Sequence, residues 1–264
     1  MNVSEGDDQQ VIAALAAAAG DDLLDVHSDP HHHRSVFTMI GEDAPRAVAR
    51  LAVECIDLRR HRGAHPRLGV VDVVPFVPLD GAALPDALRA RDAFARWAAD
   101  ELAVPCFLYG PERMLPDIRR QAWFEMFPEV VPPGPARTTA GATCVGARPV
   151  LIAYNVVLGR GVTMDEAYKI AAAIRRPGLR TLAIPVGSRI QISMNLTDPA
   201  TVGPAAAYDA VAARAPVATA ELVGLMPAAV LDTIDPERWQ QLDLAVDRTI
   251  EARLITRGVR RAAT

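Results

Sequence analysis

His65 is the residue whose type and setting most invite chemistry. It directly precedes Pro66, which biases its backbone towards an extended conformation, and Gly63 lets the chain turn just before it. A histidine held in this way projects from a loop at the mouth of the apolar run that follows, where it can act as a general base near neutral pH. The alternative is a surface histidine that packs against or caps a turn, and spacing alone favours that alternative.

Arginines surround this histidine in the sequence. Arg59 and Arg60 fit the end of a helix, where cations offset the helix dipole, whereas Arg62 and Arg67 fit that explanation less well. A guanidinium binds a carboxylate through paired hydrogen bonds, so these positions favour a site for anionic substrates. The chain has a single lysine, as a GC-rich coding sequence would explain, so the placement of arginine is more informative than its number.

Residues 25–36, "DVHSDPHHHRSV", contain four histidines and two aspartates. Such side chains are good ligands for zinc or iron, which makes a metal-dependent hydrolase one hypothesis. However, the histidines at 31–33 are consecutive and cannot easily converge on one ion from an extended loop, and no helical ligand spacing supports them. We therefore expect no dedicated metal site, and we interpret the segment as a loop that joins two strands at a cleft, with Arg34 entering the second strand.

Residues 191–198, "QISMNLTD", form a third polar group at the end of an apolar strand. Amide, hydroxyl and carboxylate groups in such a place can hydrogen-bond a polar heterocycle, with Asn195 as the candidate. The alternative is an ordinary strand end before the turn at Asp198-Pro199, and pattern alone favours it.

The composition narrows the class of protein. The 264 residues are half hydrophobic and carry a net charge of −4, which supports neither a nucleic-acid partner nor a membrane surface. Three scattered cysteines without CxxC spacing indicate a reducing compartment. No leader or membrane-spanning run is evident, so a soluble cytoplasmic protein is expected. Dinucleotide, P-loop, GxSxG and HExxH motifs are absent.

Helices and strands alternate along the chain. Apolar spacing predicts helices over 9–20, 44–60, 85–103, 163–175 and 203–215. It predicts strands over 23–29, 35–41, 70–79, 105–110, 148–158, 179–186, 189–198 and 220–227, with Pro75 indicating a bulge or edge position.

The chain divides into two halves of similar layout. Residues 128–141 are rich in proline and glycine and are the best boundary in the sequence, and the pattern restarts at 148. Strand pairs interleaved with helices are typical of split-βαβ units. We therefore expect an α+β or α/β fold of two ferredoxin-like subdomains, residues 1–147 and 148–264.

Seven blocks, taken together and in order, resemble the glutamate formimidoyltransferase family. They are "NVSEG", "LLDVHSDP…HRSVFT", "IDLRRHRGAHPRLGVVDVVPFVPL", "PCFLYG", "AGATCVGARPVLIAYNVVL", "ISMNLTD" and "ELVGLMP", between Asn2 and about Pro227. The same family forms the N-terminal half of the animal formimidoyltransferase–cyclodeaminase, whose helical second half has no counterpart here.

The resemblance implies a reaction. The family moves a formimino group from N-formimino-L-glutamate to N5 of tetrahydrofolate, in histidine degradation, without a metal. It implies two α/β subdomains with facing sheets, outer helices and the folate in a groove between them. Its members commonly pair, so a homodimer is a candidate assembly. The expected partners are thus small-molecule substrates, with tetrahydrofolate as co-substrate.

The resemblance also implies a set of site residues. The proposed catalytic histidine of the family falls on His65, with His27 and Asp25 beside it as expected catalytic residues. Residues expected to bind substrate or folate are Arg34, Arg62, Arg67, Arg148, Asn195 and Asp29.

This chain departs from the family pattern at four places. An acidic side chain usually stands where His27 is, a glutamate where Ala64 is, and an asparagine where His33 is. The family also begins with a strand that is missing ahead of Met1, which suggests a misassigned start and an exposed sheet edge. Two alternatives therefore stay open: a variant that uses N-formylglutamate or 5-formyltetrahydrofolate, and a non-catalytic folate-binding homologue.

Overall fold

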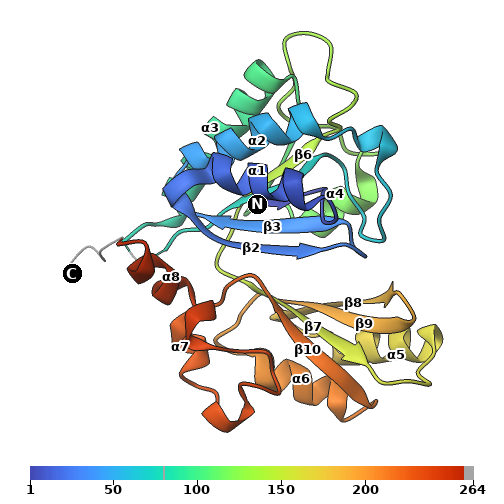
Figure 1. Ribbon diagram of the computed structural model, residues 1–264. Coiled ribbons are helices and arrows are strands. Elements are labelled where there is room, and N and C mark those ends of the chain that lie inside the picture. Colours follow the sequence, from blue (N-terminus) through green and yellow to red (C-terminus); the bar gives the residue numbers. More distant parts are fainter. Residues whose placement is uncertain (80, 259–264) are drawn as a thin grey trace. The chain divides into compact units, whose positions relative to one another are not determined.

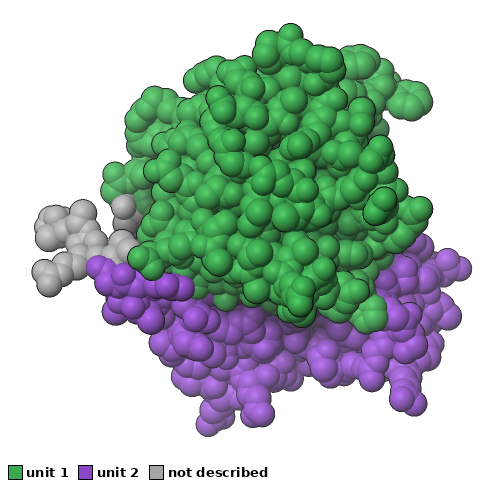
Figure 2. Space-filling model, turned by 45° about the horizontal axis from the view of Figure 1, so that its top comes forward, with its two compact units in different colours: residues 1–149 green, residues 150–264 purple. Residues whose placement is uncertain are grey.

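The computed structural model describes residues 1–79 and 81–258. It divides into two compact units, residues 1–149 and residues 150–264, shown in different colours in Figure 2. Each unit is built around one β-sheet with helices packed against it (Figure 1). This confirms the expected α+β class with two sheet-containing subdomains.

The first unit contains a mixed six-stranded sheet in the order β2-β3-β1-β4-β6-β5. Its first six elements run β-α-β-β-α-β, and their four strands have the order of a split-βαβ unit. Strands β6 and β5 extend that sheet in parallel beyond β4. The elements are β1 (Asn2–Val3), α1 (Gln9–Ala19), β2 (Leu23–Asp29), β3 (Arg34–Met39), α2 (Asp43–Cys55), β4 (Val71–Phe76), α3 (Leu84–Leu102), β5 (Cys106–Tyr109), α4 (Leu115–Gln121) and β6 (Thr143–Ala147).

Helices α1, α2 and α3 cover one face of this sheet (Figure 1). Asp8 caps α1 by accepting hydrogen bonds from two backbone N–H groups, and Gly20 ends it at φ 60°. The three helices bury small residues such as Ala52, Ala95 and Ala98, which lets them pack closely on the strands. The other face of the sheet carries a smaller core around Phe107 that α4 joins through Ile118.

The second unit contains an antiparallel four-stranded sheet in the order β10-β7-β9-β8. With α5 and α6 it again forms a split-βαβ unit, and α5 begins with a capping box between Thr163 and Glu166. The elements are β7 (Ile152–Leu158), α5 (Met164–Ile174), β8 (Leu179–Val186), β9 (Arg189–Leu196), α6 (Pro204–Ala212), β10 (Val217–Val223), α7 (Ala228–Leu231) and α8 (Ile250–Thr256).

The proline- and glycine-rich segment 128–141 is not the boundary between the units, so that prediction is wrong. Val130 pairs with Cys106, and the segment leads into β6, which lies between β4 and β5. Helix α2 also ends at Cys55, earlier than expected, and a short 3-10 turn follows at Leu58–Arg60. Pro75 of β4 pairs with β6 on one side. On the other side, β1 pairs with β4 only at Val71 and Val73, so it does not extend to Pro75.

Strand β1 has two residues and lies between β3 and β4. The amino group of Met1 is buried and donates a hydrogen bond to the carbonyl oxygen of Phe37 at 2.8 Å. Burial first, and then the charges of Arg148 and Arg34, lower the pKa of this amino group to about 5.

Candidate active site

Polar side chains share the face of the first sheet that lies opposite α1–α3. Asp25, His27 and Asp29 alternate along β2 with Val26, which packs in the helix-side core. The register places Asp29 opposite Arg34 on β3, so these four side chains lie on one face. The strands therefore bring two of the expected catalytic residues and two of the expected binding residues onto a common surface.

A fully buried carboxylate, Asp72, organises the neighbouring part of this face. Arg119 of α4 donates to both of its oxygens, at 2.8 and 2.5 Å, and Arg34 donates to one of them. The backbone N–H of Leu68 donates to it at 2.8 Å. Burial raises the pKa of Asp72, but the two guanidinium groups outweigh that effect and hold it far below its usual range. The carboxylate is thus charged and fixes both arginines.

His65 lies in the loop between Cys55 and β4, close to this charged group. Its Nδ1 is 2.7 Å from the carbonyl oxygen of Pro66, and its ring centroid is 6.3 Å from that of His32. Because a carbonyl oxygen only accepts, Nδ1 carries the proton, which leaves a lone pair on Nε2. Burial first, then the charge of Arg34, lower the pKa of His65 to about 3. The imidazole is therefore neutral at pH 7 and able to accept a proton.

Arg67 fastens the loop that carries His65 to the turn between β2 and β3. Its guanidinium donates to the carbonyl oxygens of His65, His32 and His33 at 2.7 to 3.1 Å. It also contacts Nε2 of His61 at 2.6 Å. Gly63 lies so close to this turn that a Cβ there would be 2.7 Å from the oxygen of His32. The loop is therefore held by close backbone contact as well as by Arg67.

Asp29 shapes the turn itself. Its carboxylate accepts hydrogen bonds from the backbone N–H groups of His31 and His32, and its other oxygen is 2.9 Å from Nδ1 of His32. Burial opposes these bonds, but they prevail and lower the pKa of Asp29 to about 2. His33 completes the turn at φ 50° and accepts a hydrogen bond from the N–H of Gly6. Asp29 thus holds His32 against His65.

The remaining expected binding residues lie elsewhere. Arg62 is exposed and donates to the carbonyl oxygen of His61. Arg148 follows β6 and lies near the buried Tyr109, whose pKa is raised to about 12 mainly by burial. Asn195 is an exposed residue of β9 in the second unit, on the sheet face opposite the core that α5 and α6 cover. Arg62 is therefore held by its own loop and not by the group around Asp72, and Asn195 belongs to the second unit.

Two residues of the site were missed by the sequence predictions. Asp72 interrupts the apolar run 70–76, and a charged residue in such a strand was the available signal. Arg119 gave no local signal, because it meets Asp72 across 47 residues of sequence.

The residues that the structure describes contain neither a group of metal ligands nor a membrane-spanning helix. In residues 1–79 and 81–258, no three His, Cys, Asp or Glu side chains are grouped so that they could hold a metal ion. Within the same ranges, no helix has the length and apolar character needed to cross a membrane.

Comparison with known proteins places the chain in a family. The formiminotransferase domain, N-terminal subdomain, matches residues 1–148, more than half of the chain. The chain belongs to the formiminotransferase family. This confirms the resemblance found in the sequence, and it places the group around His65 within the matched subdomain.

Named members of the formiminotransferase family show similarity over most of the chain. Glutamate formimidoyltransferase from Thermoplasma acidophilum is 34% identical over 298 aligned positions, which cover 99% of this chain and 96% of that protein. The enzyme of the same name from Streptococcus pyogenes serotype M1 is 37% identical over 227 positions, covering 75% and 76%. Formimidoyltransferase-cyclodeaminase from Rattus norvegicus is 34% identical over 267 positions, covering 86% of this chain but 49% of that protein. The chain spans about half the length of this bifunctional relative.

Proposed function

We propose that this protein is a folate-dependent transferase that moves the formimino group of N-formimino-L-glutamate to N5 of tetrahydrofolate. The observation that carries the proposal is the partly buried imidazole of His65, neutral at pH 7, beside the Arg34–Asp72–Arg119 group, in a chain of the formiminotransferase family. We propose that the reaction belongs to histidine degradation and that the protein is a homodimer, as the family resemblance implies, and that it acts in the cytoplasm, as the cysteine pattern implies.

His65 is the proposed general base and acid. N5 attacks the formimino carbon, a tetrahedral intermediate forms, and the attacking nitrogen becomes positively charged and acidic. Nε2 takes that proton and returns it to the glutamate nitrogen as the C–N bond to glutamate breaks. A weak base is enough for so acidic a proton, which fits the lowered pKa of His65. Such proton transfer contributes roughly 10²–10⁴ in rate, and holding two substrates in place contributes more.

Asp72 is proposed to hold Arg34 and Arg119 in place and to take no part in the chemical step. Its charge balances Arg34 and Arg119, so the two guanidiniums keep a fixed place beside His65 without repelling each other. A substrate carboxylate bound near these arginines would raise the pKa of His65 towards the working pH. We also propose that Arg62, Arg67, Arg148, Asn195 and Asp29 bind substrate or folate, and that Asp25 and His27 support catalysis.

The test is a side-by-side assay of His65→Gln and His31→Gln. His31 is an exposed histidine of the neighbouring turn, so it controls for the loss of an imidazole. With N-formimino-L-glutamate and tetrahydrofolate, His65→Gln should lose about 10²–10⁴ in kcat while its Kd for tetrahydrofolate changes little. His31→Gln should keep kcat within about twofold. A His65→Gln protein with unchanged kcat would refute the role of the imidazole.

Two alternatives stay open because of His27 and Ala64: a variant that uses a formyl donor, and a non-catalytic folate-binding homologue. Assays with different donors distinguish them. The same assay with N-formyl-L-glutamate, run on the unsubstituted protein, tests the formyl-handling variant. Turnover with the formyl donor alone would replace the proposed donor but keep the transfer chemistry. Tetrahydrofolate binding without turnover from either donor would show a non-catalytic folate-binding homologue.

A further inference from the structure

A cavity of about 380 Å³ lies in the second unit, and none of the residues discussed above lines it. It is formed by two loops that border the sheet: the turn after β7, Gly159 to Val162, and the β8–β9 hairpin, Ser188 to Ile190. Its apolar side is supplied by Val162 and Ile190, and its polar groups by Arg160, Arg189 and Ser188. All of its lining residues belong to this one unit.

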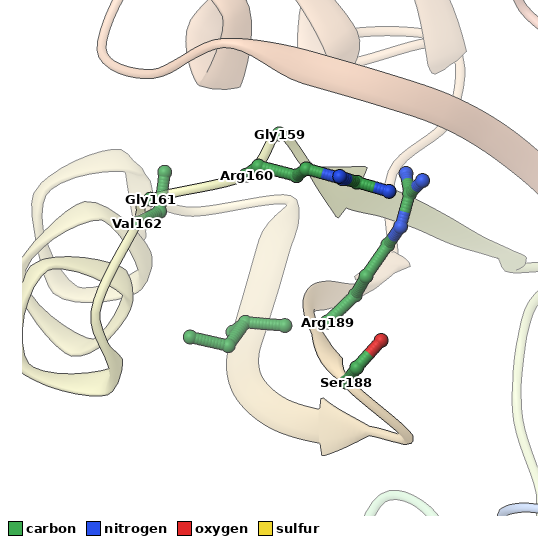
Figure 3. A pocket seen from close by; sticks show the side chains of 7 residues that line it. Gly159, Arg160, Gly161, Val162, Ser188 and Arg189 are labelled. Atoms are coloured by element: carbon green, nitrogen blue, oxygen red, sulfur yellow. The ribbon is translucent and has the colours of Figure 1, made fainter.

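Two guanidinium groups meet at this cavity. Figure 3 shows the side chains of Arg160 and Arg189 extending from different loops towards the same place. The hydroxyl of Ser188 lies below the side chain of Arg189 in this view. Both arginines are exposed, so a solute can reach them. Two like charges that converge repel each other, and the arrangement is stabilised when an anion lies between them.

Neither guanidinium has a hydrogen-bond or ion-pair partner within residues 1–79 and 81–258. Other arginines of the chain are paired with carboxylates, as Arg34 and Arg119 are with Asp72 and as Arg238 is with Asp209. No carboxylate lines the cavity. Arg160 and Arg189 therefore keep their full hydrogen-bonding capacity for a ligand.

The backbone fixes the two loops that carry these arginines. The N–H of Gly159 donates to the carbonyl oxygen of Pro216 at 2.7 Å, and a Cβ at Gly159 would lie 2.8 Å from Cβ of Pro216. The hairpin turns at Gly187, whose φ of 57° suits glycine at the first central position of a two-residue turn. The positions from which the arginines extend are thus set before any ligand binds.

We propose that this cavity binds a small oxyanion with two negative charges, either a phosphate monoester or a dicarboxylate. Each guanidinium donates paired hydrogen bonds to the oxygens of such a group, and the Ser188 hydroxyl donates a further one. The apolar side of the cavity accommodates the carbon chain that carries the charges. None of its lining residues belongs to the group around Asp72, so this proposal does not rest on the transfer reaction proposed above.

Calorimetric titration of the full chain tests the proposal. Glycerol 3-phosphate and glutarate are titrated separately at fixed ionic strength into the unsubstituted protein, Arg160→Gln, Arg189→Gln and the control Arg176→Gln. Arg176 is an exposed arginine of the same unit that does not line the cavity. At least one anion should bind saturably, and each cavity substitution should weaken it about ten- to hundredfold, while Arg176→Gln changes binding less than twofold.

The two ligands distinguish the sources of the anion. Preference for glycerol 3-phosphate assigns a phosphate monoester, and preference for glutarate assigns a dicarboxylate. Absence of saturable binding for both, or binding that Arg160→Gln and Arg189→Gln leave unchanged, would overturn the site. Because a variant can fail to fold, the amide resonances of Gly161 and Ser188 are followed in the unsubstituted chain during the same titrations. They should shift with saturation, and their failure to move would also overturn the proposal.

Discussion

The two units share one topology but use arginine in opposite ways. Both contain a βαββαβ arrangement whose strands have the same relative order. In the first unit Arg34 and Arg119 are held by a fully buried carboxylate, and Arg67 is bonded to three backbone carbonyls. In the second unit Arg160 and Arg189 lie at an exposed cavity without partners in the described part of the chain. The fold thus sets where side chains go, and their partners decide what they do.

This difference has an energetic meaning. A buried, paired guanidinium costs much to leave unpaired, because its charge has been removed from water. An exposed guanidinium keeps its hydration and costs little to replace. The first unit should therefore depend on its arginines for stability, whereas the second should depend on its cavity arginines only for binding.

Asp72→Asn should produce the largest effect. The substitution leaves two guanidiniums without a counter-charge, and we expect the first unit to lose about 3–5 kcal/mol of unfolding free energy. The matched change in the second unit is Asp209→Asn, whose exposed carboxylate pairs with Arg238 and which should cost at most about 1 kcal/mol. Hydrogen exchange followed by mass spectrometry measures each unit separately. Equal costs in the two units would contradict the comparison.

The sequence predicted the elements of both units well where a strand or helix has a strong apolar period. Strands β2 and β8 and helix α1 fall within a residue of the expected ranges. Strand β6 was missed because Thr143–Ala147 consists of small residues with no side-chain pattern typical of a strand. It lies between β4 and β5, and Gly146 leaves room for the ring of Tyr109 on the neighbouring strand, a contact that is not visible in local sequence.

The site was predictable only in part. The glycine turn and Pro66 indicated a projecting His65, and the family resemblance indicated Arg34. Asp72 was missed although its charge interrupts an apolar strand, and its pairing with Arg119 was not predictable because a salt bridge across 47 residues leaves no mark on spacing. Arg67 was expected to bind substrate, but the structure also gives it a structural task at the base of the His65 loop.

Arg67→Gln should produce the next largest effect. The change removes charged hydrogen bonds to the carbonyl oxygens of His32, His33 and His65, and it should cost the first unit about 1.5–3 kcal/mol. Arg160→Gln removes a guanidinium that has no partner among residues 1–79 and 81–258, and it should change the stability of the second unit by less than about 0.5 kcal/mol. Thermal and urea unfolding of the two variants measure these costs. A destabilising Arg160→Gln would show that this arginine is not free for a ligand.

A smaller effect is expected from Gly63→Ala. The new Cβ would lie 2.7 Å from the backbone oxygen of His32 and 2.8 Å from Cβ of His33, so the loop must shift at a cost of about 1–2 kcal/mol. At Gly203 in the second unit the nearest atom would be 3.6 Å away, and Gly203→Ala should stay within about 0.5 kcal/mol of the unsubstituted protein. Unfolding in urea measures both. If Gly63→Ala is as stable as Gly203→Ala, the loop does not pack on the turn as described.

The last expected effect is a pH dependence of the first unit, which holds all six histidines. Burial, with nearby arginines, lowers the pKa of His61 to about 4 and that of His65 to about 3, below the unfolded value of about 6.5. As the pH falls from about 6.5 to 4, His61 and His65 bind protons in the unfolded chain but remain largely unprotonated in the folded chain. The first unit therefore loses stability.

The second unit has no histidine and should keep its stability over that interval. Hydrogen exchange at several pH values, corrected for intrinsic rates, resolves the two units. His61→Gln combined with His65→Gln should reduce the pH dependence of the first unit, leaving the part due to the buried amino group of Met1, whereas His31→Gln should leave it unchanged. Equal losses in both units between pH 6.5 and 4 would mean that groups other than these two imidazoles control acid stability, and that His65 is more easily protonated than its burial implies.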